Sequence, residues 1–233
     1  MKRIISLIAS LMLIAIFTVF MAGAVPTGWT PTNVTNATFS NTSGSMEARG
    51  GNITNVDFTN VLSQTSKWQG YYGNVTGEIM LGTTSTAKMY NWTVSTIAGE
   101  VFATQASTMN YTAWEDLGPR TGAQIDTDFN FLAADSDSGT NTFTRASPVI
   151  NASGNMIPAT ANSAARTYNA TGNITWWTIA MARSSAAESN YVFAGVISND
   201  GEAYDGTTKD FQMIVPENQE TGVDTYYFYV ELT

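Results

Sequence analysis

From residue 52 to residue 233, short apolar runs alternate with clusters of Gly, Asn, Asp and Ser. Between Val75 and Leu81 apolar and polar positions alternate with a period of two, which predicts a half-buried strand. The run Gly-Thr-Thr-Ser-Thr at 82–86 follows as a turn, and Tyr90 and Trp92 then share one face of a returning strand at 89–94. Together these segments predict a β-hairpin.

The most apolar strand candidate is Ile174–Ala182, whose β-branched and aromatic residues lie on both faces and predict a place at the centre of a sheet. Further strands are predicted at 52–58, 100–104, 156–157, 191–197, 211–215 and 226–232. The segments 109–117 and 124–132 fit either a strand or a short helix. About eight to ten short strands separated by turns predict an all-β domain at 52–233, a β-sandwich of jelly-roll-like type.

The amino terminus has the pattern of an export signal. Lys2 and Arg3 precede the uncharged apolar run Ile4–Met21, and the small residues 22–24 predict cleavage after Ala24. The alternative is an uncleaved anchor, because a run of this length can also span a bilayer. Both alternatives place the rest of the chain outside the cytoplasm. Residues 25–51 are rich in Thr, Asn and Ser and predict an extended tail.

The chain of 233 residues contains neither Cys nor His. Ser-His-Asp and Cys-His nucleophile systems are therefore excluded, as are thiolate- or histidine-ligated zinc, haem and iron–sulfur sites. Without Lys2 and Arg3, 8 basic side chains face 19 acidic ones, a net charge of −11. Such a field disfavours nucleic acid as a partner, and we expect membrane contact only through the amino-terminal segment if it is uncleaved.

Ten Asn-x-Ser/Thr sequons follow the signal segment, and none has Pro at its middle position. Once the chain is exported, exposed sequons can be glycosylated. We expect the three in the tail to be the best acceptors, while Asn91 lies inside a predicted strand. The predicted acceptors are Asn33, Asn36, Asn41, Asn52, Asn74, Asn91, Asn110, Asn151, Asn169 and Asn173.

Acidic segments are candidates for Ca²⁺, which prefers oxygen ligands. The run Asp126-Thr127-Asp128-Phe129-Asn130 resembles the start of a calcium loop, but the same residues alternate as a strand with the acidic positions in water, and we favour the strand. Two acidic loops remain as weak calcium candidates, and no other cofactor is expected. Their carboxylates are Asp135, Asp137, Asp200, Glu202 and Asp205.

Neighbouring aromatic residues suggest a second kind of site. Trp176 and Trp177 cannot both be buried on one face of a strand, so one of them is a candidate for stacking on a sugar ring. Paired carboxylates could also hydrolyse glycosides without histidine. No pair stands out among the 19 carboxylates, however, and we expect no enzymatic activity and name no catalytic residue.

The run Lys67–Gly77 (KWQGYYGNVTG) resembles a group of secreted archaeal surface proteins, as do GGNIT at 50–54, MYNW at 89–92 and the closing segments DFQMIVPE and TYYFYVEL. The resemblance extends over 50–232. It implies a cell-envelope setting and supplies neither a mechanism nor site residues.

We therefore expect an extracellular, N-glycosylated structural protein of the cell surface, a self-assembling subunit of a filament or layer. Its partners would be further copies of itself or other envelope components, and its tail could add a strand to a neighbour's open sheet edge. The alternative is a glycan-binding adhesin, and a third hypothesis is a carboxylate-only glycoside hydrolase.

Overall fold

The computed structural model describes residues 27–28, 53, 55, 62–84, 86–94, 96–107, 116–183, 190–220 and 223–233. The predicted signal segment and the sequons at Asn33, Asn36, Asn41, Asn52 and Asn110 lie outside these residues, as do most of the strand predicted at 52–58 and the segment 109–115. No helix in the described ranges is long and apolar enough to cross a membrane.

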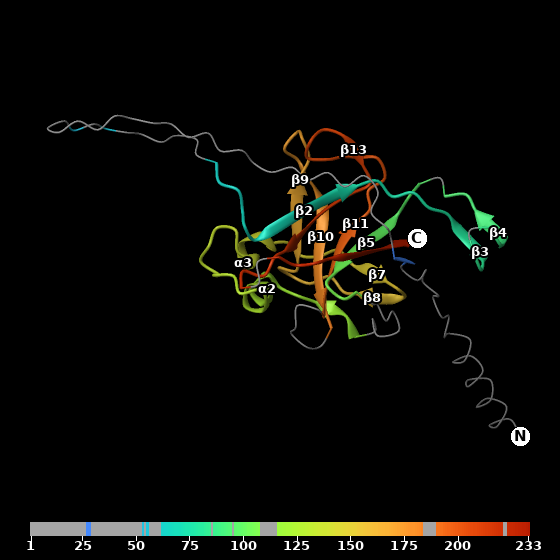
Figure 1. Cartoon of the computed structure of the whole chain (residues 1–233), viewed down its shortest axis with the longest axis horizontal. Helices are drawn as coiled ribbons and strands as arrows, with labels where there is room; N and C mark the ends of the chain where they lie inside the picture. Colours follow the sequence, from blue (N-terminus) through green and yellow to red (C-terminus); the bar gives the residue numbers. More distant parts are fainter. Residues whose placement is uncertain are drawn as a thin grey trace, which may run out of the picture.

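A seven-stranded antiparallel sheet forms the body of the protein (Figure 1). β10 lies near one side of this sheet, where β9 and β6 pair with different parts of its length. Along the sheet the order is β1 (Thr27–Gly28), β15 (Tyr227–Leu232), β5 (Gly99–Thr104), β11 (Tyr191–Val196), β10 (Ile174–Ala182), and then β9 (Ala164–Tyr168) and β6 (Gly118–Pro119).

The apolar segment predicted as a central strand is β10, with the bounds expected for it. It pairs with β11 on one side and with β9 and β6 on the other. Its residues from Thr178 to Ala182 are all buried, because other elements cover both faces of the sheet at this point. The strands predicted at 100–104, 191–197, 211–215 and 226–232 are also present as β5, β11, β14 and β15.

One face of the sheet is covered by a two-stranded ribbon of β2 (Trp68–Gly73) and β14 (Phe211–Pro216). Met213 and Val215 of the ribbon pack against Phe193 of the sheet in the larger core cluster. A hydrogen bond from the Ile214 amide to Thr178 Oγ1 (3.1 Å) fixes the ribbon across β10. The opposite face is covered by the hairpin β7 (Ile150–Ala152) and β8 (Asn155–Ile157), which contributes to a second core cluster.

Of the two conformations left open for 124–132, the structure has the helix, because residues 124–128 belong to α2 (Gly122–Asp128). The strand favoured for 126–130 is wrong. Thr121 caps this helix, and Gln124 completes the capping box. Ile125 and Phe129, four positions apart, are fully buried, which is the spacing of a helix face. Asp126, expected in water, is only 5% exposed. A second short helix, α3 (Gly139–Thr142), packs against α2.

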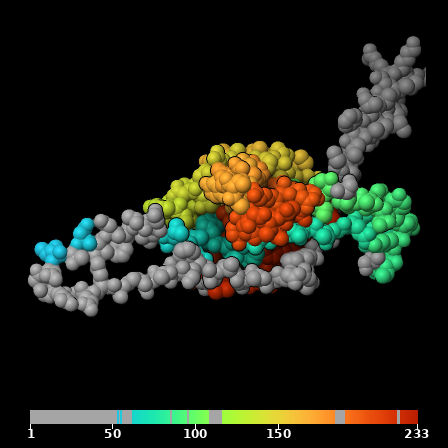
Figure 2. Space-filling model, turned by 90° about the horizontal axis from the view of Figure 1, so that it is seen from above, coloured from blue at the N-terminus to red at the C-terminus, as the bar shows by residue number. Residues whose placement is uncertain are grey.

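The predicted hairpin forms from β3 (Ile79–Gly82) and β4 (Lys88–Trp92), joined by the expected turn. The half-buried environment predicted for it is wrong, because every residue of both strands is exposed. Figures 1 and 2 show the hairpin projecting from one end of the body. A shorter hairpin pairs β12 (Gly201–Glu202) with β13 (Thr208–Lys209). The all-β class is confirmed, and the jelly-roll-like topology stays a prediction.

Candidate functional site

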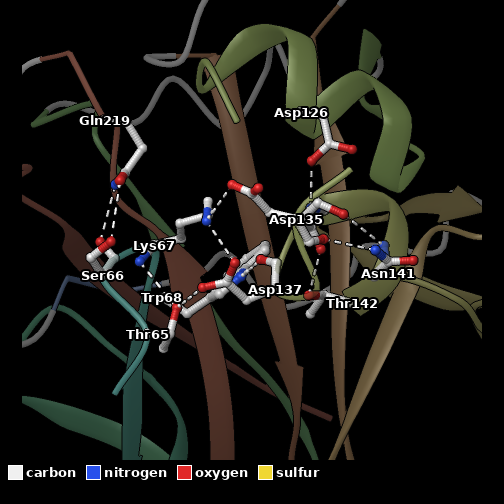
Figure 3. A network of polar contacts seen from close by, with 12 residues as sticks. Thr65, Ser66, Lys67, Trp68, Asp126, Asp135, Asp137, Asn141, Thr142 and Gln219 are labelled. Atoms are coloured by element: carbon white, nitrogen blue, oxygen red, sulfur yellow. Dashed lines mark hydrogen bonds and ion pairs between the residues drawn. The ribbon is translucent and has the colours of Figure 1, made fainter. Parts of the chain in front are cut away.

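A network of polar contacts surrounds Lys67, which directly precedes β2 (Figure 3). Its ammonium lies 2.6 Å from Asp137 Oδ1 and 3.0 Å from Asp135 Oδ2, and the residue is only 9% exposed. The hydrogen bond between Lys67 and Asp137 raises the pKa of Lys67 and lowers the pKa of Asp137. Thr65 Oγ1 donates to Asp137 Oδ2 at 2.7 Å, and Trp68 Nε1 donates to the Asp137 carbonyl at 2.7 Å.

This network includes Asp135 and Asp137, the carboxylates of one of the two predicted calcium sites. The positive charge between Asp135 and Asp137 is the Lys67 ammonium, so the structure does not support a calcium ion there. The ion pair instead joins the start of β2 to the loop between α2 and α3, elements that are 70 positions apart in sequence. Asn141 Nδ2 donates to the Asp135 carbonyl at 2.8 Å and orders the same loop. These contacts stabilise the fold at this point.

Asp126 also stabilises a contact between segments, in this case between α2 and α3. Its carboxylate accepts hydrogen bonds from the Gly139 amide (2.5 Å), the Thr140 amide (3.0 Å) and Thr140 Oγ1 (2.6 Å). A side chain at Gly139 would approach the Gly122 carbonyl oxygen to 2.5 Å, so the helices meet at these two glycines. The DTDFN run therefore stabilises a helix contact and does not form a calcium loop.

The second acidic loop does not gather its carboxylates either. Glu202 Oε2 accepts from Asn169 Nδ2 (2.6 Å) and Thr171 Oγ1 (3.2 Å). Asp205 Oδ1 accepts from the Thr207 amide and hydroxyl, and these bonds lower the pKa of Asp205. Asp200 Oδ2 accepts from Asn199. Within the described ranges no group of three or more His, Cys, Asp or Glu side chains is placed to hold a metal ion.

Both tryptophans proposed for sugar stacking contact other residues of the protein. Trp176 is 2% exposed and donates from Nε1 to the Glu202 carbonyl at 2.8 Å, so its ring offers no accessible face. Trp177 lies on the other face of β10, where the Arg166 guanidinium sits 4.4 Å from its ring centre. The stacking prediction is therefore incorrect for Trp176, and at Trp177 a sugar would have to compete with Arg166.

The sequons in the described ranges differ in accessibility. Asn74, Asn91 and Asn173 are exposed, whereas Asn151 and Asn169 are half-buried. Asn151 Oδ1 is buried without a hydrogen-bond partner. Asn169 is held by its bond to Glu202 and by a bond from the Asn173 amide to its Oδ1 at 2.8 Å. The exposed sequons are therefore the better acceptors.

A pair of buried glutamates was missed in the sequence. Glu100 of β5 and Glu231 of β15 are opposite partners in the sheet and are 8% and 1% exposed. Glu231 Oε2 accepts from the Ser153 amide at 2.7 Å, in the turn between β7 and β8. Glu231 Oε1 and Glu100 Oε2 have no hydrogen-bond partner. Glu100 directly precedes the apolar run 101–103 and Glu231 interrupts the run 228–232, which is the sequence signal that marked them.

Burial and the charge of Glu231 raise the pKa of Glu100 to about 7, and burial also raises the pKa of Glu231. Each carboxylate charge opposes ionisation of the other, so we infer that the pair keeps a proton to higher pH than a free glutamate does. A glycoside hydrolase also sets paired carboxylates at a substrate cleft. These two lie instead beneath the β7–β8 turn, which leaves no room for a sugar between them.

One shallow pocket lies beside the ribbon, with a volume of about 150 Å³. Its lining includes Tyr71, Pro216 and Tyr226 together with the acidic Glu217 and Asp224. Pockets that enclose small ligands usually measure roughly 300–1,000 Å³. This depression is too small to support a small-molecule site.

No family model, no curated protein and no solved structure matched this chain. The resemblance to secreted archaeal surface proteins therefore stays a prediction.

Proposed function

We propose that this protein is an exported, N-glycosylated structural protein of the cell surface that assembles with copies of itself by exchanging an amino-terminal strand. The observation that supports this proposal is the pairing of β1 with β15. Thr27 lies opposite Val230 and Gly28 opposite Tyr229, three residues beyond the predicted cleavage site at Ala24.

β15 offers an edge that β1 only partly covers. β15 has six residues, and its register with β1 includes two of them, Tyr229 and Val230. In the described part of the chain, no other strand pairs with this side of β15. An edge with open amide and carbonyl groups is a template for another strand. The same amino-terminal segment can therefore complete its own sheet or the sheet of a neighbour.

The composition fits such an assembly. The chain has no Cys, so no disulfide can stabilise it outside the cell, and contacts between copies would supply stability instead. Most of its polar surface comes from neutral Thr, Ser and Asn, which allows close approach of subunits despite the acidic balance. The exposed sequons Asn74, Asn91 and Asn173 lie outside β1 and β15, so glycans on them would not be attached to either of the pairing strands.

Strand exchange can be tested by disulfide trapping, because the native chain contributes no background thiol. The double variant Thr27→Cys with Val230→Cys places two thiols at opposite positions of neighbouring strands, within disulfide range. Exchange predicts covalent oligomers on a non-reducing gel, increasing with protein concentration. Each single variant controls for random collision.

The matched control is Glu202→Cys with Thr208→Cys, which are opposite partners within the β12–β13 hairpin. This pair must close within one chain and gives a monomer at every concentration. If the Thr27–Val230 pair behaves in the same way, and the native protein also stays monomeric in solution, strand exchange is wrong. The glycan-binding and hydrolase alternatives require no change of size with concentration.

A further inference from the structure

The β3–β4 hairpin has one apolar face that nothing in the described residues covers. Ile79 pairs with Trp92 and Leu81 pairs with Tyr90, and opposite residues of an antiparallel pair project to the same side. The Tyr90 and Trp92 rings confirm this placement, since their centres are 5.0 Å apart in an edge-to-face contact. These four side chains are between 36% and 59% exposed.

The other face of the hairpin is mixed, because exposed Met80 and Met89 accompany its polar groups. Lys88 forms an ion pair with Glu78, and Asn91 Nδ2 donates to Glu78 Oε2 at 3.1 Å. Met80 lies opposite Asn91 on this face, and Asn91 is a sequon. The two charges cancel, so the hairpin is neutral although the whole chain is acidic. A glycan on Asn91 would extend from this mixed face and leave the apolar face free.

The position of the hairpin in the fold indicates what the apolar face meets. A side chain at Gly77, just before β3, would come within 2.7 Å of Leu232 Cδ1, so the hairpin leaves the body at the Leu232 end of β15. β1 runs antiparallel to β15 with Thr27 at Val230, so the chain enters the sheet from that same end. Figure 1 shows β3 and β4 beyond the labelled carboxyl terminus.

The covalent chain limits how far the apolar segment 4–21 can be from this end. Six peptide steps join Met21 to Thr27. A fully extended chain spans at most about 3.6 Å for each residue, so Met21 lies within roughly 22 Å of Thr27. If the segment is retained in a membrane, the surface of that membrane is necessarily close to the Leu232 end of the sheet and to the hairpin.

We propose that the apolar face of the β3–β4 hairpin docks on the surface of the membrane that retains the amino-terminal segment. This inference adopts the uncleaved-anchor alternative and is independent of strand exchange. Tyr and Trp are the residues that favour the boundary between lipid and water, and the neutral hairpin avoids the repulsion that an acidic surface would meet at anionic lipid. Lying flat, the hairpin directs Asn91 away from the lipid.

A second copy of the chain fits this face less well. The exposed parts of its four large side chains amount to roughly 400 Å² in each copy, whereas a stable dimer buries about 1,200–2,000 Å² in total. Membrane docking does not need so large an area. The anchor already holds the hairpin at the bilayer, so the contact forms within one tethered molecule at a high effective concentration.

Site-specific fluorescence on the full-length chain tests this proposal. A polarity-sensitive NBD label is attached at Leu81→Cys on the apolar face, or at Asn91→Cys on the mixed face, in a chain with no other thiol. Both proteins are reconstituted through residues 1–24 into phosphatidylcholine vesicles, with and without brominated acyl chains. We expect the label at position 81 to shift to shorter wavelength, gain severalfold in intensity and be quenched by bromine, and the label at position 91 to remain in water.

Tyr90→Ser with Trp92→Ser should abolish the signal at position 81 and leave the melting temperature unchanged, because neither residue belongs to the core. Labels that stay in water at both positions would overturn the proposal. So would protection at position 81 without bromine quenching, which would assign the face to another protein copy, or isolation of the native protein with Val25 as its first residue. None of these outcomes bears on disulfide trapping at Thr27 and Val230.

Discussion

Glu100 and Glu231 lie opposite each other on β5 and β15, and each keeps one buried carboxylate oxygen without a hydrogen-bond partner. The positions are buried near the ends of the two strands, where a hydrophobic residue would ordinarily be cheaper. The charge of Glu231 raises the pKa of Glu100, and no cation among the described residues lowers the pKa of either carboxyl. The folded protein therefore keeps a proton here that the unfolded chain releases at lower pH.

This pair predicts that the protein loses stability as the pH rises. The pKa of Glu100 is about 7 in the folded state against 4.5 in the unfolded chain, so the folded state binds more protons between these values. The free energy of unfolding should fall across this window by about 3 kcal/mol at most, and level off above it. Urea unfolding at pH 5 and pH 8 measures the difference.

The control for this prediction is Glu100→Gln, which mimics the protonated side chain. It should match the native protein near pH 5, exceed it in stability at pH 8, and lose most of the dependence on pH. A native protein that is equally stable at both values, or a variant with the same slope, would contradict the raised pKa of Glu100.

Lys67→Met removes the ammonium that joins β2 to the loop between α2 and α3. The two carboxylates left behind are 37% and 39% exposed, so water screens much of their repulsion. We expect a loss of about 1–2 kcal/mol in the free energy of unfolding, measured with urea at pH 7. Lys88→Met breaks the exposed pair with Glu78 on the hairpin and should leave stability unchanged; equal effects would mean that the Lys67 network contributes nothing.

Gly99→Ala tests how closely β5 meets the end of β15. Gly99 has a φ of +125°, and a Cβ there would lie 2.0 Å from the Glu231 carbonyl oxygen. The backbone must move, so we expect a loss of more than about 2 kcal/mol. Gly172→Ala, with a φ of +81° and open space around it, should cost only about 1 kcal/mol. Thermal unfolding monitored by circular dichroism ranks the two variants, and the reverse order would contradict this contact.

Glycan occupancy should follow accessibility among the described sequons. Peptide mapping of the native protein is expected to find modification at Asn74, Asn91 and Asn173 more often than at Asn151 and Asn169, which are half-buried. Preferential modification of Asn151 would require β7 to open and expose it.

Sequence reasoning located β5, β10, β11, β14, β15 and the β3–β4 hairpin, but it missed β2 and β9. Ile174–Ala182 was recognisable because both its faces are covered, so the apolar residues form one continuous run. The period of two at Val75–Leu81 correctly indicated the extended conformation of the hairpin but not its exposure, because alternation records two different faces and not what covers them. Helix α2 has seven residues, which is less than two full helical turns. The hydrophobic period of so short a segment does not distinguish a helix from a strand.

The polar sites were harder to predict because each joins distant segments. In the sequence, Asp137 has the pattern of a turn residue. Its partner Lys67 is 70 positions away and comes beside it only in the fold. Glu100 and Glu231 likewise become a pair only through the register of β5 and β15. Trp176 and Trp177 were correctly expected on opposite faces, but only the structure shows the Glu202 carbonyl and the Arg166 guanidinium that occupy them.

The pairings of β5 with β15 and of β2 with β14 also determine when the chain can fold. Each joins an early segment to one near the carboxyl end, 99–104 to 227–232 and 68–73 to 211–216. Neither layer can close until those late strands have been synthesised, and contacts of such long range form slowly. The two layers therefore stay incomplete during nearly the whole synthesis of the chain, which is the condition that export of an unfolded chain through a narrow pore would require.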